Sequence, residues 1–103
     1  MKLLTKQLER LLAQHPLYSG EKDRNPPILV KFFTPWTNWT WYVLEGDQQA
    51  NGDWLFFGLV EGFETELGYF TLSELQSMSG PGGLTIERDR YFGAKRLNDV
   101  RTR

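Results

Sequence analysis

The stretch ILVKFFTPWTNWTWYVLE, residues 28–45, decides the fold that this sequence predicts. It begins with ILVKFFT and ends with WTWYVLE, two runs rich in β-branched and aromatic residues, and the residues PWTN separate them. Two such runs joined by a short turn are typical of neighbouring antiparallel strands. Alternation along the second run gives two faces, one with Trp39, Trp41 and Val43 and the other with Thr40, Tyr42 and Leu44.

Two more strands follow at short intervals. The run WLFFGLVE, residues 54–61, comes after an Asn51-Gly52 turn signal, and ELGYF, residues 66–70, follows a turn near residues 62–65. Both faces of the run at 54–61 are apolar, which indicates an interior strand. Short turns between successive strands predict an antiparallel meander.

One helix is predicted before the sheet and another after its fourth strand. Leucines at helical spacing predict an amphipathic N-terminal helix that ends before Pro16: Leu4, Leu8, Leu11 and Leu12. The residues TLSE, 71–74, form a capping box that starts a short helix over residues 72–78. A last strand is expected around residues 84–88.

These elements predict a single α+β domain over residues 1–103, built as an antiparallel β-meander of four to five strands with two helices. Residues 18–27 are polar and rich in turn formers, so we expect a mobile loop there. Residues 94–103 are expected to form a loosely held basic tail.

The composition argues against most enzyme classes. The chain has no cysteine, which excludes disulfides, a thiolate nucleophile and a cysteine-based zinc site. Its one histidine, His15, ends a predicted helix, and no phosphate-binding loop is present. We therefore expect no cofactor and favour a non-enzymatic protein. The sequence shows neither a signal peptide nor a membrane-spanning stretch, so we expect a cytoplasmic protein without a membrane partner.

Charge is segregated along the chain. Residues 32–87 contain eight acidic residues and no Lys or Arg, whereas both ends are basic. Either the ends fold back and neutralise the middle, or the acids form a face for a basic partner or a metal, with the basic ends free for nucleic acid.

The turn between the first two strands is the first candidate site. Trp36 lies there after Pro35, either folded back as a plug or exposed as an anchor for a protein partner. The partner-binding residues predicted here are the turn and its flanks: Trp36, Thr37, Asn38, Lys31, Glu45 and Asp47.

Two alternative sites follow from the charges. Acids at strand ends around one hairpin are candidates for holding Mg²⁺: Glu45, Asp47, Asp53 and Glu61. Basic residues near the C-terminus are candidates for holding nucleic-acid phosphates: Arg88, Arg90, Lys95 and Arg96.

Three segments, KFFTPWTNWTWYVLEGD, LFFGLVEGFETELGYFTLSEL and GLTIERDRYF, give the chain a resemblance to a known family. It resembles the small uncharacterised proteins, classed as a domain of unknown function, that bacterial plasmids, integrative conjugative elements and phages carry. The resemblance implies a bacterial, cytoplasmic setting on a mobile element, near genes for DNA transfer or for evading host defence. Some members carry a label as single-stranded DNA nucleases, but no family catalytic residue is carried across to this chain.

The expected function is that of a non-enzymatic binding protein of a mobile element. It would dock on a host or element-encoded protein, such as a defence or DNA-processing factor. The alternative is a protein that binds single-stranded nucleic acid or a Mg-dependent nuclease. The sequence does not fix the oligomeric state.

Overall fold

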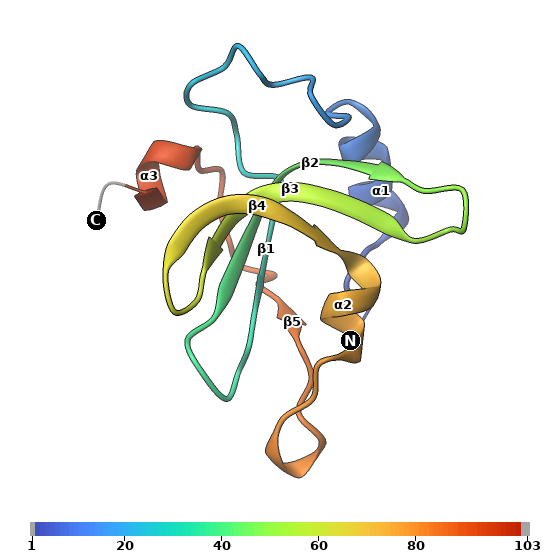
Figure 1. The fold of residues 1–103 in the computed structure, drawn as a ribbon, viewed down its shortest axis with the longest axis vertical. Helices are drawn as coiled ribbons and strands as arrows, with labels where there is room; N and C mark the ends of the chain where they lie inside the picture. The colour runs from blue at the N-terminus through green and yellow to red at the C-terminus, as the bar shows by residue number, and fades with distance from the viewer. Residues whose placement is uncertain (1, 102–103) are drawn as a thin grey trace.

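The structure is a computed structural model that describes residues 2–101. Its centre is one sheet of five antiparallel strands in the order β4-β3-β2-β1-β5 (Figure 1). The strands are β1 (Val30–Phe33), β2 (Thr40–Gln48), β3 (Trp54–Glu61), β4 (Thr65–Thr71) and β5 (Glu87–Arg88). The helices are α1 (Lys6–Ala13), α2 (Leu72–Ser77) and α3 (Leu97–Arg101), and a 3₁₀ turn spans Pro81–Gly83. The α+β class, the N-terminal helix and the short helix after the fourth strand are confirmed.

Local signals explain where both predicted helices begin. The Thr5 side chain accepts a hydrogen bond from the Leu8 N–H at the start of α1. At α2, Thr71 accepts from the Glu74 N–H and the Glu74 side chain accepts from the Thr71 N–H, which is the capping box that the sequence predicted. Each cap satisfies backbone donors that the first turn of a helix leaves without partners.

One cluster of buried side chains covers the first face of the sheet. Phe32, Trp41, Val43, Phe56 and Phe70 of the strands meet Leu12 of α1, Leu75 of α2 and the N-terminal Leu3 and Leu4. Figure 1 shows α1 and α2 together on this side of the sheet, with α3 on the other side. The apolar stripe predicted for the first helix therefore packs on the sheet through Leu12, which is fully buried.

A second cluster covers the opposite face. Tyr42, Leu44 and Leu59 of the strands pack there with Ile28 and with Leu97 and Val100 of α3. The sequence did not predict α3, since residues 94–103 were expected to be loosely held. Leu97 and Val100 are only 3% and 5% exposed, and their burial anchors the segment up to Arg101. Residues 102–103 lie outside the described part of the chain.

The sheet contains one irregularity, in β2. Val43 pairs with Gly58 and Glu45 pairs with Phe57, so Leu44 is an extra residue in the ladder. Such a bulge interrupts the alternation of side chains. Glu45 therefore lies on the same face as Leu44, and not on the face of Trp41 and Val43 as a regular strand would place it.

Candidate functional site

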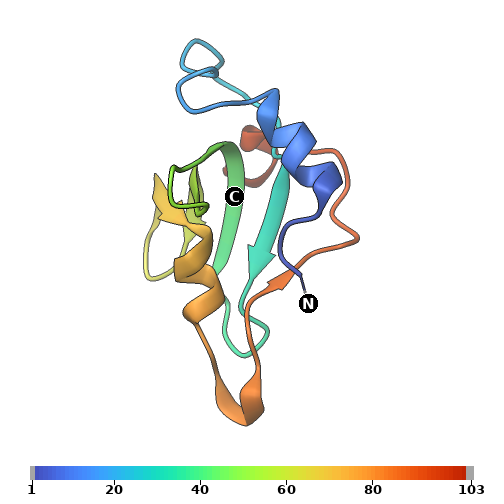
Figure 2. The same cartoon turned by 90° about the vertical axis from the view of Figure 1, so that its right-hand side faces the viewer.

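The six predicted partner-binding residues lie in three separate places. Trp36, Thr37 and Asn38 occupy the β1–β2 turn, Lys31 lies within β1, and Glu45 and Asp47 lie in β2 beyond the bulge. Figures 1 and 2 place the β1–β2 turn and the loop with the 3₁₀ turn at the same end of the molecule.

Threonine side chains close the β1–β2 turn. Thr34 is buried, its hydroxyl is hydrogen-bonded to the Thr37 hydroxyl, and it accepts a bond from the Trp39 N–H at 3.1 Å. The Thr34 N–H donates to the Trp39 carbonyl, also at 3.1 Å. These bonds fix the direction in which the turn presents Trp36.

Trp36 is folded back on the molecule. It is half-buried against the first cluster, and its indole lies so close to Gly80 that a Cβ at that glycine would overlap the ring. This geometry corresponds to the plug among the two arrangements considered for Trp36, with part of the ring still accessible. Its role in partner binding, with Thr37 and Asn38, stays a prediction.

The exposed anchor at this end is Phe63, in the β3–β4 turn. Its side chain is 96% exposed, and its ring stands edge-on to Trp39 with a centroid separation of 5.4 Å. Trp39 in turn packs over Gly62 and lies 5.8 Å from Trp41, centroid to centroid. We call Trp36, Trp39 and Phe63 the aromatic end. Sequence reasoning treated residues 62–65 only as a turn, although a phenylalanine among turn acids was a visible signal.

Acidic residues flank Phe63 in the sequence. Glu61, Glu64 and Glu66 lie within three positions of it, and residues 32–87 contain no cation. Among residues 2–101, the ion pairs join Lys31 to Asp89 at 3.5 Å and Arg96 to Asp23 at 4.0 Å. Both pairs lie outside residues 32–87, so the basic ends do not neutralise the acids of the middle through these contacts. The β3–β4 turn that carries Phe63 is therefore rich in acidic residues.

Glu45 and Asp47 hold the loop that follows α1. The Glu45 carboxylate accepts the Tyr18 N–H and the Gly20 N–H, both at 2.8 Å, and the Asp47 carboxylate accepts the Leu17 N–H at 3.2 Å. Glu45 is only 9% exposed. Tyr18 has a φ of 71°, a conformation that is uncommon for a bulky residue. These bonds attach residues 17–20 to the sheet, at the point where the predicted mobile loop over residues 18–27 begins.

Lys31 is committed to contacts within the chain. It forms its ion pair with Asp89 and lies 5.9 Å and 5.7 Å from the ring centroids of Tyr42 and Phe92. These cation–π contacts attach the segment after β5 to the sheet.

The four acids proposed for Mg²⁺ do not come together. Glu45 accepts hydrogen bonds from N–H groups of the loop, and Glu61 accepts a bond from the Tyr42 hydroxyl at 3.4 Å. Asp53 accepts bonds from the Ser73 hydroxyl at 2.6 Å and the Trp54 N–H at 2.8 Å. The Ser73 hydrogen bond lowers the pKa of Asp53, and the bonds from the Trp54 and Ser73 N–H groups add to this effect. Within residues 2–101, no three His, Asp or Glu side chains are grouped so that they would hold a metal. In this structure these acids accept hydrogen bonds from backbone and hydroxyl donors, and the Mg²⁺ site stays a prediction.

The four basic candidates are also divided. Arg88 donates to the carbonyls of Lys2 at 2.7 Å and Leu3 at 3.2 Å, and Arg96 donates to the Asn25 carbonyl at 2.8 Å. Arg88 and Arg90 line a groove of about 630 Å³ between α1 and β1, and Lys95 lies in a different hollow beside Lys31. Arg10 and Lys31 also line the groove, which makes its wall basic.

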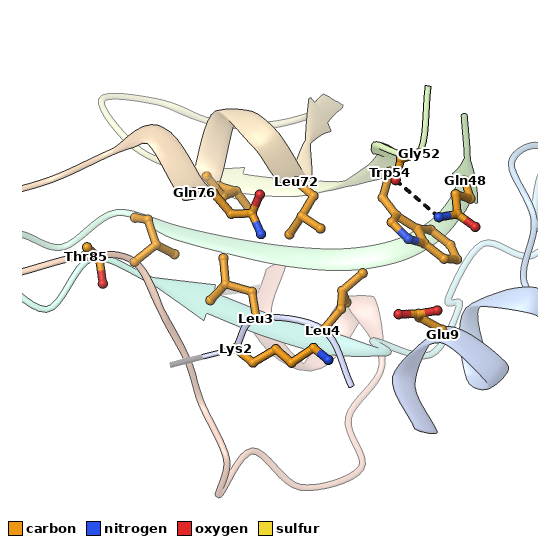
Figure 3. A pocket seen from close by; sticks show the side chains of 12 residues that line it. Lys2, Leu3, Leu4, Glu9, Gln48, Gly52, Trp54, Leu72, Gln76 and Thr85 are labelled. Carbon is orange, nitrogen blue, oxygen red and sulfur yellow. Dashed lines mark hydrogen bonds between the residues drawn. The ribbon is translucent and has the colours of Figure 1, made fainter. Parts of the chain in front are cut away.

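A smaller cavity of about 270 Å³ lies between α2 and the N-terminal segment (Figure 3). Its walls include core residues such as Leu3, Leu4 and Trp54, and Gln48 closes one side by donating to the Gly52 carbonyl at 3.2 Å. It contains none of the predicted site residues, and Glu9 is its only acid. Polar side chains such as Lys2, Glu9 and Gln76 share its walls with the leucines.

None of the helices in residues 2–101 is long and apolar enough to cross a bilayer.

Comparison with curated proteins and with solved structures finds no match. A family described as a protein of unknown function, DUF2958, matches residues 3–99 and so covers nearly all of the chain. The chain therefore belongs to the DUF2958 family.

Proposed function

We propose that this protein is a non-enzymatic binding protein that docks on another protein through its aromatic end. The observation that carries the proposal is the 96% exposure of Phe63 on a turn between two ordered strands. Water contact with a full phenyl ring is unfavourable, and large aromatic side chains are the residues that dominate protein interfaces. The ring stands edge-on to Trp39, and this contact favours its presentation at the aromatic end.

The charges indicate the chemistry of the partner. Glu61, Glu64 and Glu66 lie within three positions of Phe63 in the sequence, and residues 32–87 contain no Lys or Arg. A partner with an apolar pocket rimmed by Lys or Arg would complement this surface and would be steered to it by the electrostatic field. The proposed setting is the cytoplasm of a bacterium that carries a mobile element. The proposed partner is a host or element-encoded defence or DNA-processing factor.

The experiment is capture from a bacterial lysate with immobilised protein, followed by identification of what is retained. Phe63→Ala removes the exposed anchor, and Trp36→Ala removes the ring that lies on Gly80. Tyr91→Ala is the matched control, because Tyr91 is also an exposed aromatic residue, at 93%, but lies outside the aromatic end. Circular dichroism and thermal melting confirm that each variant is folded.

We expect one basic protein to be retained by wild type and by Tyr91→Ala, and to bind Phe63→Ala at least about tenfold more weakly, since an anchor residue is worth roughly 2 kcal/mol or more. Its release should become easier as salt is raised. If Phe63→Ala retains the same proteins as wild type with equal affinity, the aromatic end is not the docking surface.

A second candidate, the binding of single-stranded nucleic acid, is supported by the groove between α1 and β1. Arg10, Lys31, Arg88 and Arg90 line it, and its volume of about 630 Å³ admits a phosphate backbone. Fluorescence anisotropy with a single-stranded DNA oligonucleotide over a salt series tests it, since phosphate contacts weaken steeply with salt. Arg10→Glu with Arg90→Glu should abolish such binding. Absence of binding by wild type at low salt removes this candidate.

A further inference from the structure

Strand β4 forms an open end of the sheet. The strand order is β4-β3-β2-β1-β5, so β4 has a neighbour on one side only, whereas the opposite end is closed by β5, which is two residues long. β4 contains seven residues, Thr65–Thr71, and is therefore the long edge of this sheet.

The ladder fixes which backbone groups of β4 point outward. The Gln49 N–H donates to the Asp53 carbonyl, which makes this pair the first hydrogen-bonded pair of the β2–β3 hairpin. Hydrogen-bonded and non-hydrogen-bonded pairs alternate along an antiparallel ladder. The backbone groups of residues 56, 58 and 60 therefore point toward β4, and their partners 70, 68 and 66 point back toward β3. Residues 65, 67 and 69 direct their N–H and C=O groups away from the sheet, whereas the N–H of Thr71 is already bonded to the Glu74 carboxylate in the cap of α2.

This edge lacks the usual protection against pairing with another chain. Edge strands are commonly shielded by lysine, proline, a bulge or a very short length. The sequence TELGYFT contains neither lysine nor proline, and its pairing with β3 has no bulge. Leu67 and Tyr69 are 37% and 53% exposed, and both line a cleft of about 630 Å³ beside Tyr18.

We propose that β4 pairs with β4 of a second copy of this chain, antiparallel about a two-fold axis at Gly68. The reason for a second copy is that the strand is nearly symmetrical about that residue. Leu67 would lie opposite Tyr69 in two hydrogen-bonded pairs, and Thr65 would lie opposite Thr71 at both ends, where the Thr71 N–H stays with Glu74 and only the side chains meet. Thr–Thr and aromatic–aliphatic pairs are favourable across strands. The single charge, Glu66, would lie opposite Phe70, so no like charges face each other directly.

Gly68 supplies an independent reason. A Cβ at Gly68 would meet nothing within 4 Å, and Gly68 is not among the glycines with positive φ. Nothing within this chain therefore requires a glycine there, although glycine weakens a strand. On the proposed axis, Gly68 faces its own copy in a non-hydrogen-bonded pair, where two strands approach most closely. A glycine at this point suits the close approach of a second backbone.

The absence of cysteine in the chain allows a test that is specific for this register. In a non-hydrogen-bonded pair the Cα atoms are about 4.5 Å apart, within the range that a disulfide spans. Gly68→Cys should therefore cross-link to a covalent dimer under mild oxidation at low protein concentration. Glu66→Cys is the matched control, because its copies would lie four residues apart along the strand, about 13 Å. Cross-linking of Glu66→Cys as fast as Gly68→Cys, or of neither, would overturn the proposal.

A second measurement does not depend on a cysteine. Sedimentation equilibrium over a concentration series should show a monomer–dimer equilibrium for wild type and at least a tenfold weaker one for Leu67→Lys. Leu84→Lys is the control, since Leu84 has a similar exposure of 41% but lies outside β4. A wild type that stays monomeric throughout, or a Leu67→Lys variant that dimerises like wild type, would count against the pairing of β4. Neither measurement involves Phe63, so failure of the docking proposal would be seen separately.

Discussion

Glu45 shows how one acidic residue connects a loop to the sheet. Its carboxylate receives two backbone N–H groups from residues 18–20, and the side chain is nearly enclosed. A buried carboxylate needs such partners, because ionisation without hydrogen bonds is costly away from water. The same two bonds stabilise the positive φ of Tyr18, so the loop and the acid depend on each other.

We expect Glu45→Ala to lower the free energy of unfolding by about 2–3 kcal/mol, because two N–H groups lose a charged acceptor. Urea denaturation measures this change. Hydrogen exchange should also show faster exchange of the Tyr18 and Gly20 amides. Glu64→Ala is the control, since Glu64 is exposed and should change stability little. Unchanged exchange at Tyr18 and Gly20 in Glu45→Ala would contradict this account of the loop.

Tyr69 and Tyr18 interact through their phenol groups. The hydrogen bond that the Tyr69 phenol shares with Tyr18 favours the neutral phenol and raises the pKa of Tyr69, and desolvation and the nearby acids Glu45 and Glu21 act in the same direction. A raised pKa means that the fold favours the neutral phenol. The resulting stabilisation is fully present below the ordinary pKa near 10 and is lost as the pH rises through the folded value.

The test is an NMR titration that follows the ring carbon next to the Tyr69 hydroxyl, because ultraviolet absorbance would sum all four tyrosines. We expect Tyr18→Phe to bring the pKa of Tyr69 down toward its ordinary value, while Tyr91→Phe, which alters a distant exposed phenol, leaves it unchanged. If the pKa of Tyr69 stays raised in Tyr18→Phe, desolvation and the acids are its main cause.

At the level of elements, Asp53 joins the β2–β3 hairpin to the start of α2. Its carboxylate accepts the hydroxyl and the N–H of Ser73, which lies in the first turn of the helix. A carboxylate at a helix N-terminus also interacts favourably with the helix dipole. The pKa of Asp53 is lowered mainly by the Ser73 hydroxyl. The stability that this provides is present above the ordinary pKa near 4 and is lost as the pH falls through the folded value.

Ser73→Ala should raise the pKa of Asp53 toward its ordinary value, because the strongest donor is removed. NMR titration of the side-chain carboxyl carbon measures the shift. Ser77→Ala, which removes a hydroxyl bonded to the Glu74 carbonyl, is the matched control in the same helix and should leave Asp53 unchanged. Equal titration of Asp53 in wild type and Ser73→Ala would show that the hairpin is not coupled to α2 through this bond.

Elements with a strong local signal were predictable from the sequence. The third strand has the predicted limits, residues 54–61, because a turn signal precedes an uninterrupted apolar run. The capping box at Thr71 places the start of α2, and alternation in the second strand assigns Trp41 and Tyr42 to opposite faces. In each of these, the information lies within a few neighbouring residues.

The remaining features depend on contacts between distant segments. The bulge at Leu44 changes the face on which Glu45 lies. No sequence pattern within TWYVLEGD predicts this bulge. Helix α3 is held by Leu97 and Val100, whose partners Ile28, Tyr42 and Leu59 lie far away in sequence. Periodicity over five residues is too short to predict a helix, because most helical stability comes from tertiary packing. The acids proposed for Mg²⁺ accept hydrogen bonds from donors in other segments. The sequence pattern around each acid does not identify those donors.

At the scale of the whole molecule, helices from different parts of the chain cover the two faces of the sheet. α1 and α2 cover one face, and the C-terminal α3 covers the other. A domain of 103 residues has a small core, so each layer contributes a large share of the stability. The C-terminal helix is therefore expected to be required for a stable fold.

We expect Leu97→Ala to lower the free energy of unfolding by about 2–5 kcal/mol, as is usual for a buried leucine. Leu84→Ala is the matched control because that leucine is 41% exposed, and it should cost much less. Urea denaturation of both variants gives the comparison. Similar small losses in the two variants would mean that α3 contributes little to the fold.

The bulge in β2 also has a consequence for the lengths that relatives of this chain can adopt. Val43 and Glu45 already pair with neighbouring residues of β3, Gly58 and Phe57. A chain without Leu44 would keep every other side chain of β2 on its present face. Loss of a residue elsewhere in β2 would turn all the positions beyond it to the opposite face, unless the bulge moved with it. Leu44 is thus the position at which β2 can lose one residue while its other side chains keep their faces, although the second cluster would lose one buried leucine.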